Sequence, residues 1–183
     1  MSLPLVVPSI LMLYGQQGSG KSHLIKHIMQ THKNIFDYGI VFCKTKHTGC
    51  FNYIKDSRFI HAKYEPSAFK NLLDIQKKQS IDTMRDAFVI FDDCLGKKQW
   101  ECPILLDLMT QVRHHKITVL ISTQYPKLVT PTIRELSFVS VIFPGFVQQS
   151  ARQHLHECCS GVRHKDKYSH HMIDVKTFTK FMN

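Results

Sequence analysis

A run of eight residues near the start of the chain has the types and spacing that hold a phosphate chain. The run fits G-x-x-x-x-G-K-S at every fixed position and reads Gly15, Gln16, Gln17, Gly18, Ser19, Gly20, Lys21, Ser22. The glycines let backbone N–H groups turn inward around phosphate oxygens. Lys21 would place its charge on the β- and γ-phosphates, and Ser22 would offer its hydroxyl to Mg²⁺. These residues therefore predict a site for ATP and Mg²⁺.

Two adjacent aspartates supply the second piece of chemistry. Asp92 and Asp93 directly follow the apolar run 87–91. An acidic residue in that place holds the Mg²⁺ shell beside a phosphate loop, so we expect Asp92 to share the metal with Ser22. The next carboxylate, Asp93, is expected to act as general base on the attacking water. The alternative is a cap on a turn after the strand, where aspartate is common.

Strand and helix patterns alternate along the chain and would position these groups. Apolar runs predict strands at 10–14, 38–43, 59–62, 87–91, 117–122 and 138–143, and amphipathic stretches predict helices at 21–32, 66–78 and 104–114. This order is typical of an α/β fold, here a P-loop NTPase of the RecA-like (ASCE) type. Its sheet would be mainly parallel and covered by helices on both faces. We expect an ATPase core at 1–149 and a basic, histidine-rich extension of the same domain at 150–183.

The segment 111–126 resembles one superfamily of such enzymes. It contains an arginine, a short turn, a hydrophobic strand, a Thr-Gln pair and a proline, and 131–134 adds a further proline and arginine. This pattern is similar to that of the FtsK–HerA superfamily of DNA-pumping ATPases. Within it, the chain looks most like the poxvirus-type genome-packaging ATPases of large DNA viruses, virophages and Polintons. The resemblance covers residues 9–145.

Three further residues acquire expected roles. Gln124 ends a strand that would lie beside the one carrying Asp92, where it can bind the γ-phosphate or the lytic water. The resemblance makes Arg113 the arginine finger, which reaches the γ-phosphate of a neighbouring subunit. Arg134 is the second candidate for a finger, or a sensor in cis. The alternatives are a surface polar residue for Gln124 and a helix C-terminal cation for Arg113.

The charge of the chain points to a polyanionic partner. Its net charge is +10 and its pI is about 9.4, and nucleic acid fits such a balance. Lys97, Lys98 and Trp100 follow the acidic pair in an expected loop that would grip DNA, with the indole against a sugar or base. The alternative is a solvated loop with Trp100 packed at a surface. A second basic stretch, weighed equally, comprises Lys44, Lys46, Lys55, Arg58 and Lys63.

The cysteines and the N-terminus indicate the compartment. The chain has six cysteines without a C-x-x-C pair, which are expected to be reduced thiols. Nothing resembles a signal peptide or a membrane span, so we expect a soluble, intracellular protein without a membrane partner. The tail residues His154, His156, Cys158, Cys159 and His164 invite a zinc site, but their spacing lacks the usual paired ligands.

These observations favour an ATP-hydrolysing motor. The resemblance implies that it translocates double-stranded DNA and packages a viral genome into a capsid. It further implies a homo-oligomeric ring, a pentamer or hexamer, with possible contacts to capsid proteins, in an infected host cell and possibly the virion. The alternatives are a nucleotide or small-molecule kinase, for which no arginine-rich lid is visible, and a non-motor ATP-binding assembly switch. A GTPase is disfavoured because no N-K-x-D segment stands in the right place.

Overall fold

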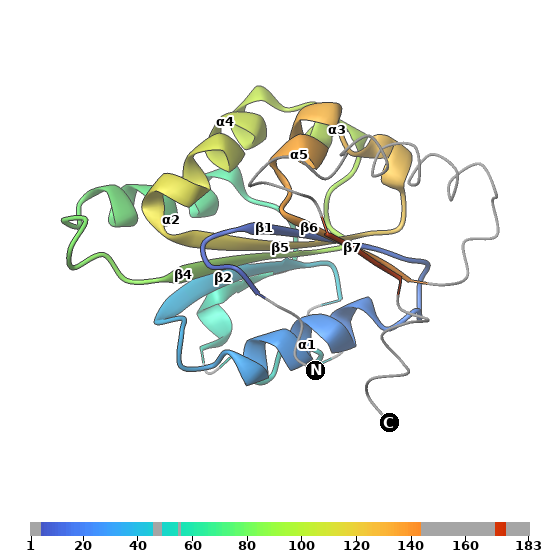
Figure 1. Cartoon of the computed structure of the whole chain (residues 1–183), viewed down its shortest axis with the longest axis horizontal. Helices are drawn as coiled ribbons and strands as arrows, with labels where there is room; N and C mark the ends of the chain where they lie inside the picture. The colour runs from blue at the N-terminus through green and yellow to red at the C-terminus, as the bar shows by residue number, and fades with distance from the viewer. Residues whose placement is uncertain (1–4, 46–48, 55, 144–170, 175–183) are drawn as a thin grey trace.

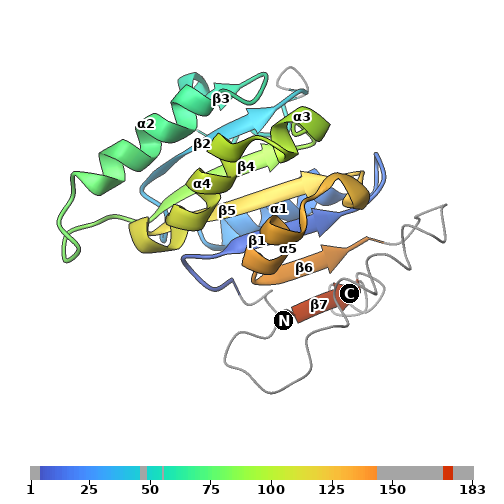
Figure 2. The same cartoon turned by 90° about the horizontal axis from the view of Figure 1, so that it is seen from above.

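Seven strands pair in parallel to form one sheet in the order β3-β2-β4-β5-β1-β6-β7 (Figure 2). The structure is a computed structural model, and it describes residues 5–45, 49–54, 56–143 and 171–174. The strands are β1 (Ile10–Tyr14), β2 (Tyr38–Cys43), β3 (Ile60–His61), β4 (Ala87–Asp92), β5 (Ile117–Thr123), β6 (Val139–Ile142) and β7 (His171–Asp174). Because all pairs are parallel, the carboxyl ends of the strands lie at one edge of the sheet.

The strand β1 lies inside the sheet between β5 and β6. Its register pairs Ile10 with Val119 and Leu11 with Val139. All five of its residues are buried, which explains why its sequence is a continuous apolar run without alternation. Successive side chains still point to opposite faces, so β1 contributes to both cores of the molecule.

Helices cover both faces of the sheet. The core on one face is built with α2 (Pro66–Lys77), α4 (Pro103–Gln111) and α5 (Pro131–Leu136), and each of these begins with a proline. The core on the other face is built with α1 (Lys21–Thr31), which packs Leu24, Ile25, Ile28 and Met29 against the sheet. Figure 1 shows α1 on one side of the strands and α4 and α5 on the other. The predicted parallel sheet covered on both faces is confirmed.

Some predicted boundaries differ from the observed ones. The helix predicted at 104–114 is α4 followed by a 3₁₀ turn, η3 (Val112–His115), and the strand predicted at 59–62 has only the two residues of β3. Two short 3₁₀ turns, η2 (Ser57–Phe59) and η4 (Pro126–Leu128), complete the elements within the described ranges. The short helix α5 was not expected from the sequence.

The expected loop at 96–100 is instead the short helix α3 (Lys97–Trp100). The N–H groups of Gln99 and Trp100 both donate to the carbonyl of Gly96, at 3.0 Å each, and close this turn. Trp100 is 1% exposed and belongs to the core that also contains Leu105 and Leu108. The free energy gained by burying its large ring exceeds the tendency of its polar sequence neighbours to keep this segment in solvent. The prediction that Trp100 lies against DNA is therefore wrong.

A part-buried network of hydrogen bonds lies at the amino edge of the sheet. Gln76 is fully buried, accepts a hydrogen bond from the Tyr38 hydroxyl at 2.7 Å and donates to the carbonyl of Arg85 at 2.8 Å. Gln79 donates to the same hydroxyl at 2.6 Å and accepts from the Arg85 N–H at 3.1 Å. The network ties the end of α2 to the segment that leads into β4.

The predicted C-terminal extension is described only in part. The tail residues that invited a zinc site, His154, His156, Cys158, Cys159 and His164, lie outside the described residues. The strand β7 falls within the extension and pairs with β6 at the edge of the sheet. In the described ranges we find no helix long and apolar enough to cross a membrane.

Candidate nucleotide site

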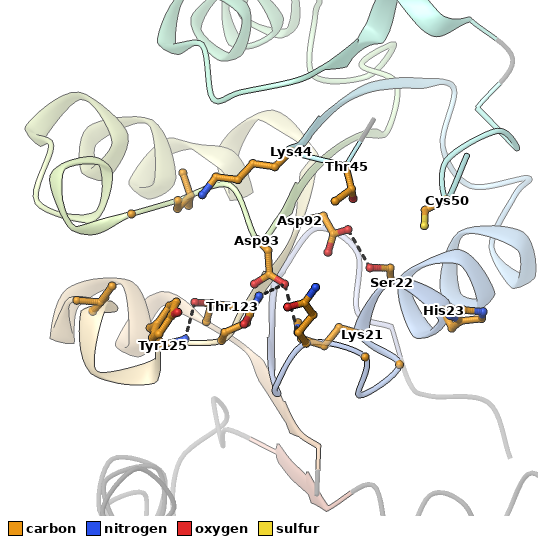
Figure 3. A pocket seen from close by; sticks show the side chains of 17 residues that line it. Lys21, Ser22, His23, Lys44, Thr45, Cys50, Asp92, Asp93, Thr123 and Tyr125 are labelled. Atoms are coloured by element: carbon orange, nitrogen blue, oxygen red, sulfur yellow. Dashed lines mark hydrogen bonds and ion pairs between the residues drawn. The ribbon is translucent and has the colours of Figure 1, made fainter. Parts of the chain in front are cut away.

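A pocket of about 540 Å³ opens at the carboxyl ends of β1, β2, β4 and β5 (Figure 3). Loops that follow four different strands form its wall. They contribute Gln17, Gly18, Gly20, Lys21, Ser22, His23, Lys44, Thr45, Cys50, Asp92, Asp93, Leu95, Gly96, Thr123, Gln124, Tyr125 and Leu128. The pocket thus brings together the glycine loop, both aspartates and the glutamine that the sequence singled out.

The glycine loop has the backbone that a phosphate cradle requires. Gly18 has φ 76° and Gly20 has φ 100°. Residues other than glycine rarely adopt such positive φ values. A side chain on Gly15 would meet the Cβ of Phe143 at 2.8 Å, so this position must also stay small. The loop ends at the first turn of α1, whose free N–H groups favour an anion.

Lys21 lies inside this loop and is 4% exposed. Its Nζ donates to the carbonyls of Gly15 at 2.8 Å and Gln16 at 2.9 Å, and it lies 3.3 Å from Oδ2 of Asp93. A cation buried at this depth is stabilised by such partners. It is therefore held at the phosphate loop before any anion arrives.

Asp92 is the fixed member of the acidic pair. It is 4% exposed, and its Oδ2 accepts from the Ser22 hydroxyl at 2.8 Å and from the Cys43 thiol at 3.7 Å. Its Oδ1 accepts from the hydroxyl of Ser122, the residue directly opposite it in register, at 2.5 Å. Burial and the charge of Asp92 raise the pKa of the Cys43 thiol, which keeps the proton on sulfur.

Asp93 is held differently from its neighbour. Its backbone is left-handed, with φ 48°, which turns its side chain into the pocket while its N–H donates to the Ser122 hydroxyl at 3.1 Å. Its Oδ2 accepts from Nε2 of Gln124 at 3.1 Å and faces the ammonium group of Lys21. The side chain is 29% exposed. Asp93 thus has two side-chain partners and an open path to solvent.

The two arginines singled out from the sequence do not line this pocket. Arg113 lies in η3, before β5 begins, and therefore at the amino edge of the sheet. Its guanidinium is exposed and donates to the carbonyl of Leu136 at 3.0 Å. Arg134 lies on α5 and donates to the carbonyl of Val129 at 2.6 Å. The length of β5 thus separates Arg113 from the phosphate loop of its own chain.

Most of the described basic residues singled out for DNA binding do not line the pocket. Lys97 and Lys98 on α3 are exposed, and Lys97 has only a loose contact of 3.9 Å with Glu101. Of the second basic stretch, Lys44 lines the pocket and Arg58 pairs with Asp56 at 2.7 Å. Lys46 and Lys55 lie outside the described residues.

Several residues of the site were missed from the sequence. Ser122 anchors both aspartates, and Cys43 and Thr45 contribute from the end of β2. A signal for Ser122 existed, because it precedes Thr123 and Gln124 at the end of a strand expected to pair with β4. In the described part of the chain, Cys43, Cys50, Cys94 and Cys102 form no disulfide, and no group of three or more His, Cys, Asp or Glu side chains is placed to hold a metal ion.

Known proteins share this sequence pattern and fold. A family model described as "Poxvirus A32 protein" matches residues 5–143. An uncharacterized protein of Acanthamoeba polyphaga mimivirus is 29% identical over 140 residues, which cover 69% of this chain and 49% of that protein. An uncharacterized protein of Invertebrate iridescent virus 6 is 29% identical over 130 residues, 69% of this chain and 50% of that protein. The chain thus spans about half the length of these relatives.

A solved structure extends the comparison to the fold. The genome packaging NTPase B204 of Sulfolobus turreted icosahedral virus 2, in complex with AMP, superposes with a TM-score of 0.60 at 20% identity. The match covers 84% of this chain and 83% of B204. At this identity the likeness shows a shared fold, and that fold is the P-loop NTPase architecture predicted from the sequence.

Proposed function

The chain belongs to the poxvirus A32 protein family, and on that premise we propose that it is an ATP-hydrolysing motor that moves double-stranded DNA during the packaging of a viral genome. The relationship to poxvirus-type packaging ATPases predicted from the residues is confirmed by the family match. The observation that carries the proposal is the convergence of Lys21, Asp92, Asp93 and Gln124 on one pocket. Its structural neighbour B204 is a genome packaging NTPase, which agrees with this assignment.

Nucleotide binding requires Lys21 to exchange partners. Its present contacts are two loop carbonyls and Asp93, and a triphosphate would offer more negative charge at the same place. Once Lys21 turns to the β- and γ-phosphates, Asp93 loses its ion pair and keeps only Gln124. ATP binding therefore releases the carboxylate that hydrolysis needs.

The residues present fit a magnesium ion. Ser22 and Asp92 place a hydroxyl and a carboxylate oxygen 2.8 Å apart, and both are oxygen donors of the kind that Mg²⁺ prefers. These two residues would hold the ion, which would neutralise charge on the β- and γ-phosphates. Hydrogen bonds from Ser122 and Cys43 keep the Asp92 carboxylate oriented.

Asp93 and Gln124 would carry out the hydrolytic step. Asp93 accepts a proton from a water whose oxygen attacks the γ-phosphorus, and Gln124 holds that water in line. The bond between the γ-phosphorus and the β–γ bridging oxygen breaks, which yields ADP and inorganic phosphate. The proton on Asp93 then passes to solvent through the open side of the pocket.

Arg113 would act on a second copy of the chain. It lies at the edge of the sheet opposite to its own pocket, so it can meet a γ-phosphate only in a neighbour's site. An arginine supplied in this way stabilises the charge that develops during phosphoryl transfer. This role requires a ring or at least a dimer, and the form that we propose is a pentameric or hexameric ring in which each site is completed by the next subunit. Arg134 stays the second candidate for this role.

The decisive experiment compares the ATPase rate with and without duplex DNA. The proposal predicts hydrolysis that duplex DNA stimulates and that Lys21→Ala abolishes. Stimulation by a small phosphate acceptor in place of DNA would indicate a kinase. A nucleotide that binds without turnover, with or without DNA, would indicate an assembly switch.

A further inference from the structure

The burial of Trp100 leaves the lysines of α3 without an aromatic neighbour at the surface. The aromatic side chain of Tyr125, which lines the pocket, is exposed to solvent. Tyr125 is 64% exposed, lines the pocket and directly follows Gln124. Figure 3 shows it on the side of the pocket away from His23 and Cys50.

Tyr125 belongs to a turn that is braced at several points. The Tyr125 N–H donates to the Thr123 hydroxyl at 3.2 Å, and its carbonyl accepts from the Leu128 N–H at 3.0 Å. Pro126 is buried, and the Arg134 guanidinium holds the carbonyl of Val129 just beyond the turn. The turn therefore presents Tyr125 and Lys127 to solvent in a fixed arrangement, and we call Tyr125–Lys127 the tip.

The tip and the residues that lead into α3 border the same pocket. Leu95 and Gly96 line this pocket together with Tyr125 and Leu128. Lys97 and Lys98 directly follow Gly96, Lys127 belongs to the tip, and all three lysines are exposed. Exposed lysines and an exposed phenol on two segments that line one pocket match the phosphate backbone of a nucleic acid, which is contacted by lysine and tyrosine side chains alike.

On the basis of the proposed function, we propose that the tip contacts the phosphate backbone of double-stranded DNA together with Lys97 and Lys98 and transmits that contact to Gln124. The Tyr125 hydroxyl donates to a phosphate oxygen, and Lys127 neutralises a flanking phosphate. Because Tyr125 and Gln124 are joined by one peptide bond, a displacement of the braced turn as one unit shifts the amide that holds Asp93. DNA at the pocket mouth thereby controls when Asp93 is free to act.

The test separates the two contacts by their dependence on salt. Binding of a short labelled duplex to the 183-residue chain is measured between about 50 and 200 mM salt. Lys127→Ala should lower the slope of log Kobs against log salt by about 0.9, because one phosphate is no longer neutralised. Tyr125→Phe should weaken binding roughly tenfold at every salt concentration and leave the slope unchanged, because an uncharged phenol does not neutralise a phosphate and so releases no counterion. Lys78→Ala, an exposed lysine at the opposite edge of the sheet, is the matched control and should bind like the parent.

A second measurement tests transmission. At saturating duplex, Tyr125→Phe should show a smaller ratio of DNA-stimulated to DNA-free hydrolysis than Lys78→Ala. A parental ratio for Tyr125→Phe would overturn the link to Gln124. Equal reductions of slope in Lys127→Ala and Lys78→Ala would overturn the tip as a defined contact.

The outcomes also distinguish this inference from the proposed function. If the unaltered chain binds no duplex, the motor proposal itself fails. If it binds duplex and both tip variants bind like the parent, the tip alone is wrongly assigned. Parental DNA binding by Tyr125→Phe with altered sedimentation would place the tip at a contact between copies and overturn the proposal.

Discussion

The two edges of the sheet are both rich in polar groups but are held together in different ways. At the amino edge, Gln76, Gln79 and Tyr38 form hydrogen bonds with one another in a part-buried network. At the carboxyl edge, Lys21 and Asp93 form an ion pair next to a pocket that opens to solvent. Contacts of the first kind fix a shape, whereas contacts of the second kind can be exchanged for a ligand. The difference indicates that the amino edge is structural and that the carboxyl edge is the functional site.

The largest effect is expected for Arg113→Ala. It would contradict a purely structural role for the amino edge, because Arg113 lies there and is proposed to be catalytic. Arg113→Ala should lower DNA-stimulated hydrolysis by about 10³–10⁵-fold, since a finger stabilises the charge of the transition state. The measurement is the steady-state ATPase rate. A thermal melt of the same variant controls for any destabilisation caused by removing the hydrogen bond to Leu136.

Mixing decides whether Arg113 acts between subunits. Arg113→Ala combined with Lys21→Ala in the presence of duplex DNA should recover some activity, because one mixed interface keeps an intact finger and an intact phosphate loop. If the two inactive variants assemble together without recovery, Arg113 is structural and Arg134 becomes the better candidate.

The second prediction sharpens the contrast between fixed and exchangeable groups within the acidic pair. Asp93→Asn should keep ATP binding but lose turnover by about 10²–10⁴-fold, because the amide cannot accept the proton of the attacking water. Asp92→Asn should in addition weaken Mg²⁺-dependent binding, because it removes the charge of the carboxylate that Ser22 and Ser122 orient. The measurements are single-turnover hydrolysis and nucleotide binding with and without Mg²⁺. Full activity of Asp93→Asn would move the role of base to another residue.

The third prediction tests the scaffold itself. Gln76→Ala should reduce the free energy of unfolding by about 1–3 kcal/mol, because in this part-buried network the Arg85 carbonyl loses its donor and the Tyr38 hydroxyl loses its acceptor. Chemical denaturation measures this reduction, and exposed Lys77→Ala on the same helix serves as the control. A selective decrease in nucleotide affinity at unchanged stability would contradict the assignment of this edge to structure.

The smallest effect concerns α3 at the working edge. Replacing Lys97 and Lys98 together with alanine should lower the salt slope of DNA binding by roughly one unit for each phosphate that is no longer neutralised. Duplex binding over a salt series measures it. An unchanged slope would show that Lys97 and Lys98 are ordinary solvated residues that do not contact DNA.

The sequence was sufficient where function depends on short, contiguous patterns. The phosphate loop, the acidic pair and the strand–helix alternation were all recognisable, because each needs particular residues at particular spacing. The placement of Gln124 beside Asp93 followed from the order of strands in this fold.

Sequence reasoning failed where tertiary packing decides. Trp100 follows two lysines and a glutamine, and only the elements packed above it create the space that buries it. Ser122 looked like one more strand residue until the register placed it opposite Asp92. Arg134 donates to the backbone carbonyl of Val129, and no local sequence pattern predicted the turn that places this carbonyl there.

The position of β1 between β5 and β6 also dictates when the site can exist during synthesis. The strand that ends in the glycine loop is made well before its two sheet neighbours, which begin only at Ile117 and Val139. At ribosomal rates of about 5–20 residues per second, this apolar strand waits on the order of ten seconds for its partners. Pairings so distant in sequence also slow the folding step itself. A newly made chain therefore completes its proposed ATP site late, and during that interval the exposed apolar segment Ile10–Tyr14 needs protection from aggregation.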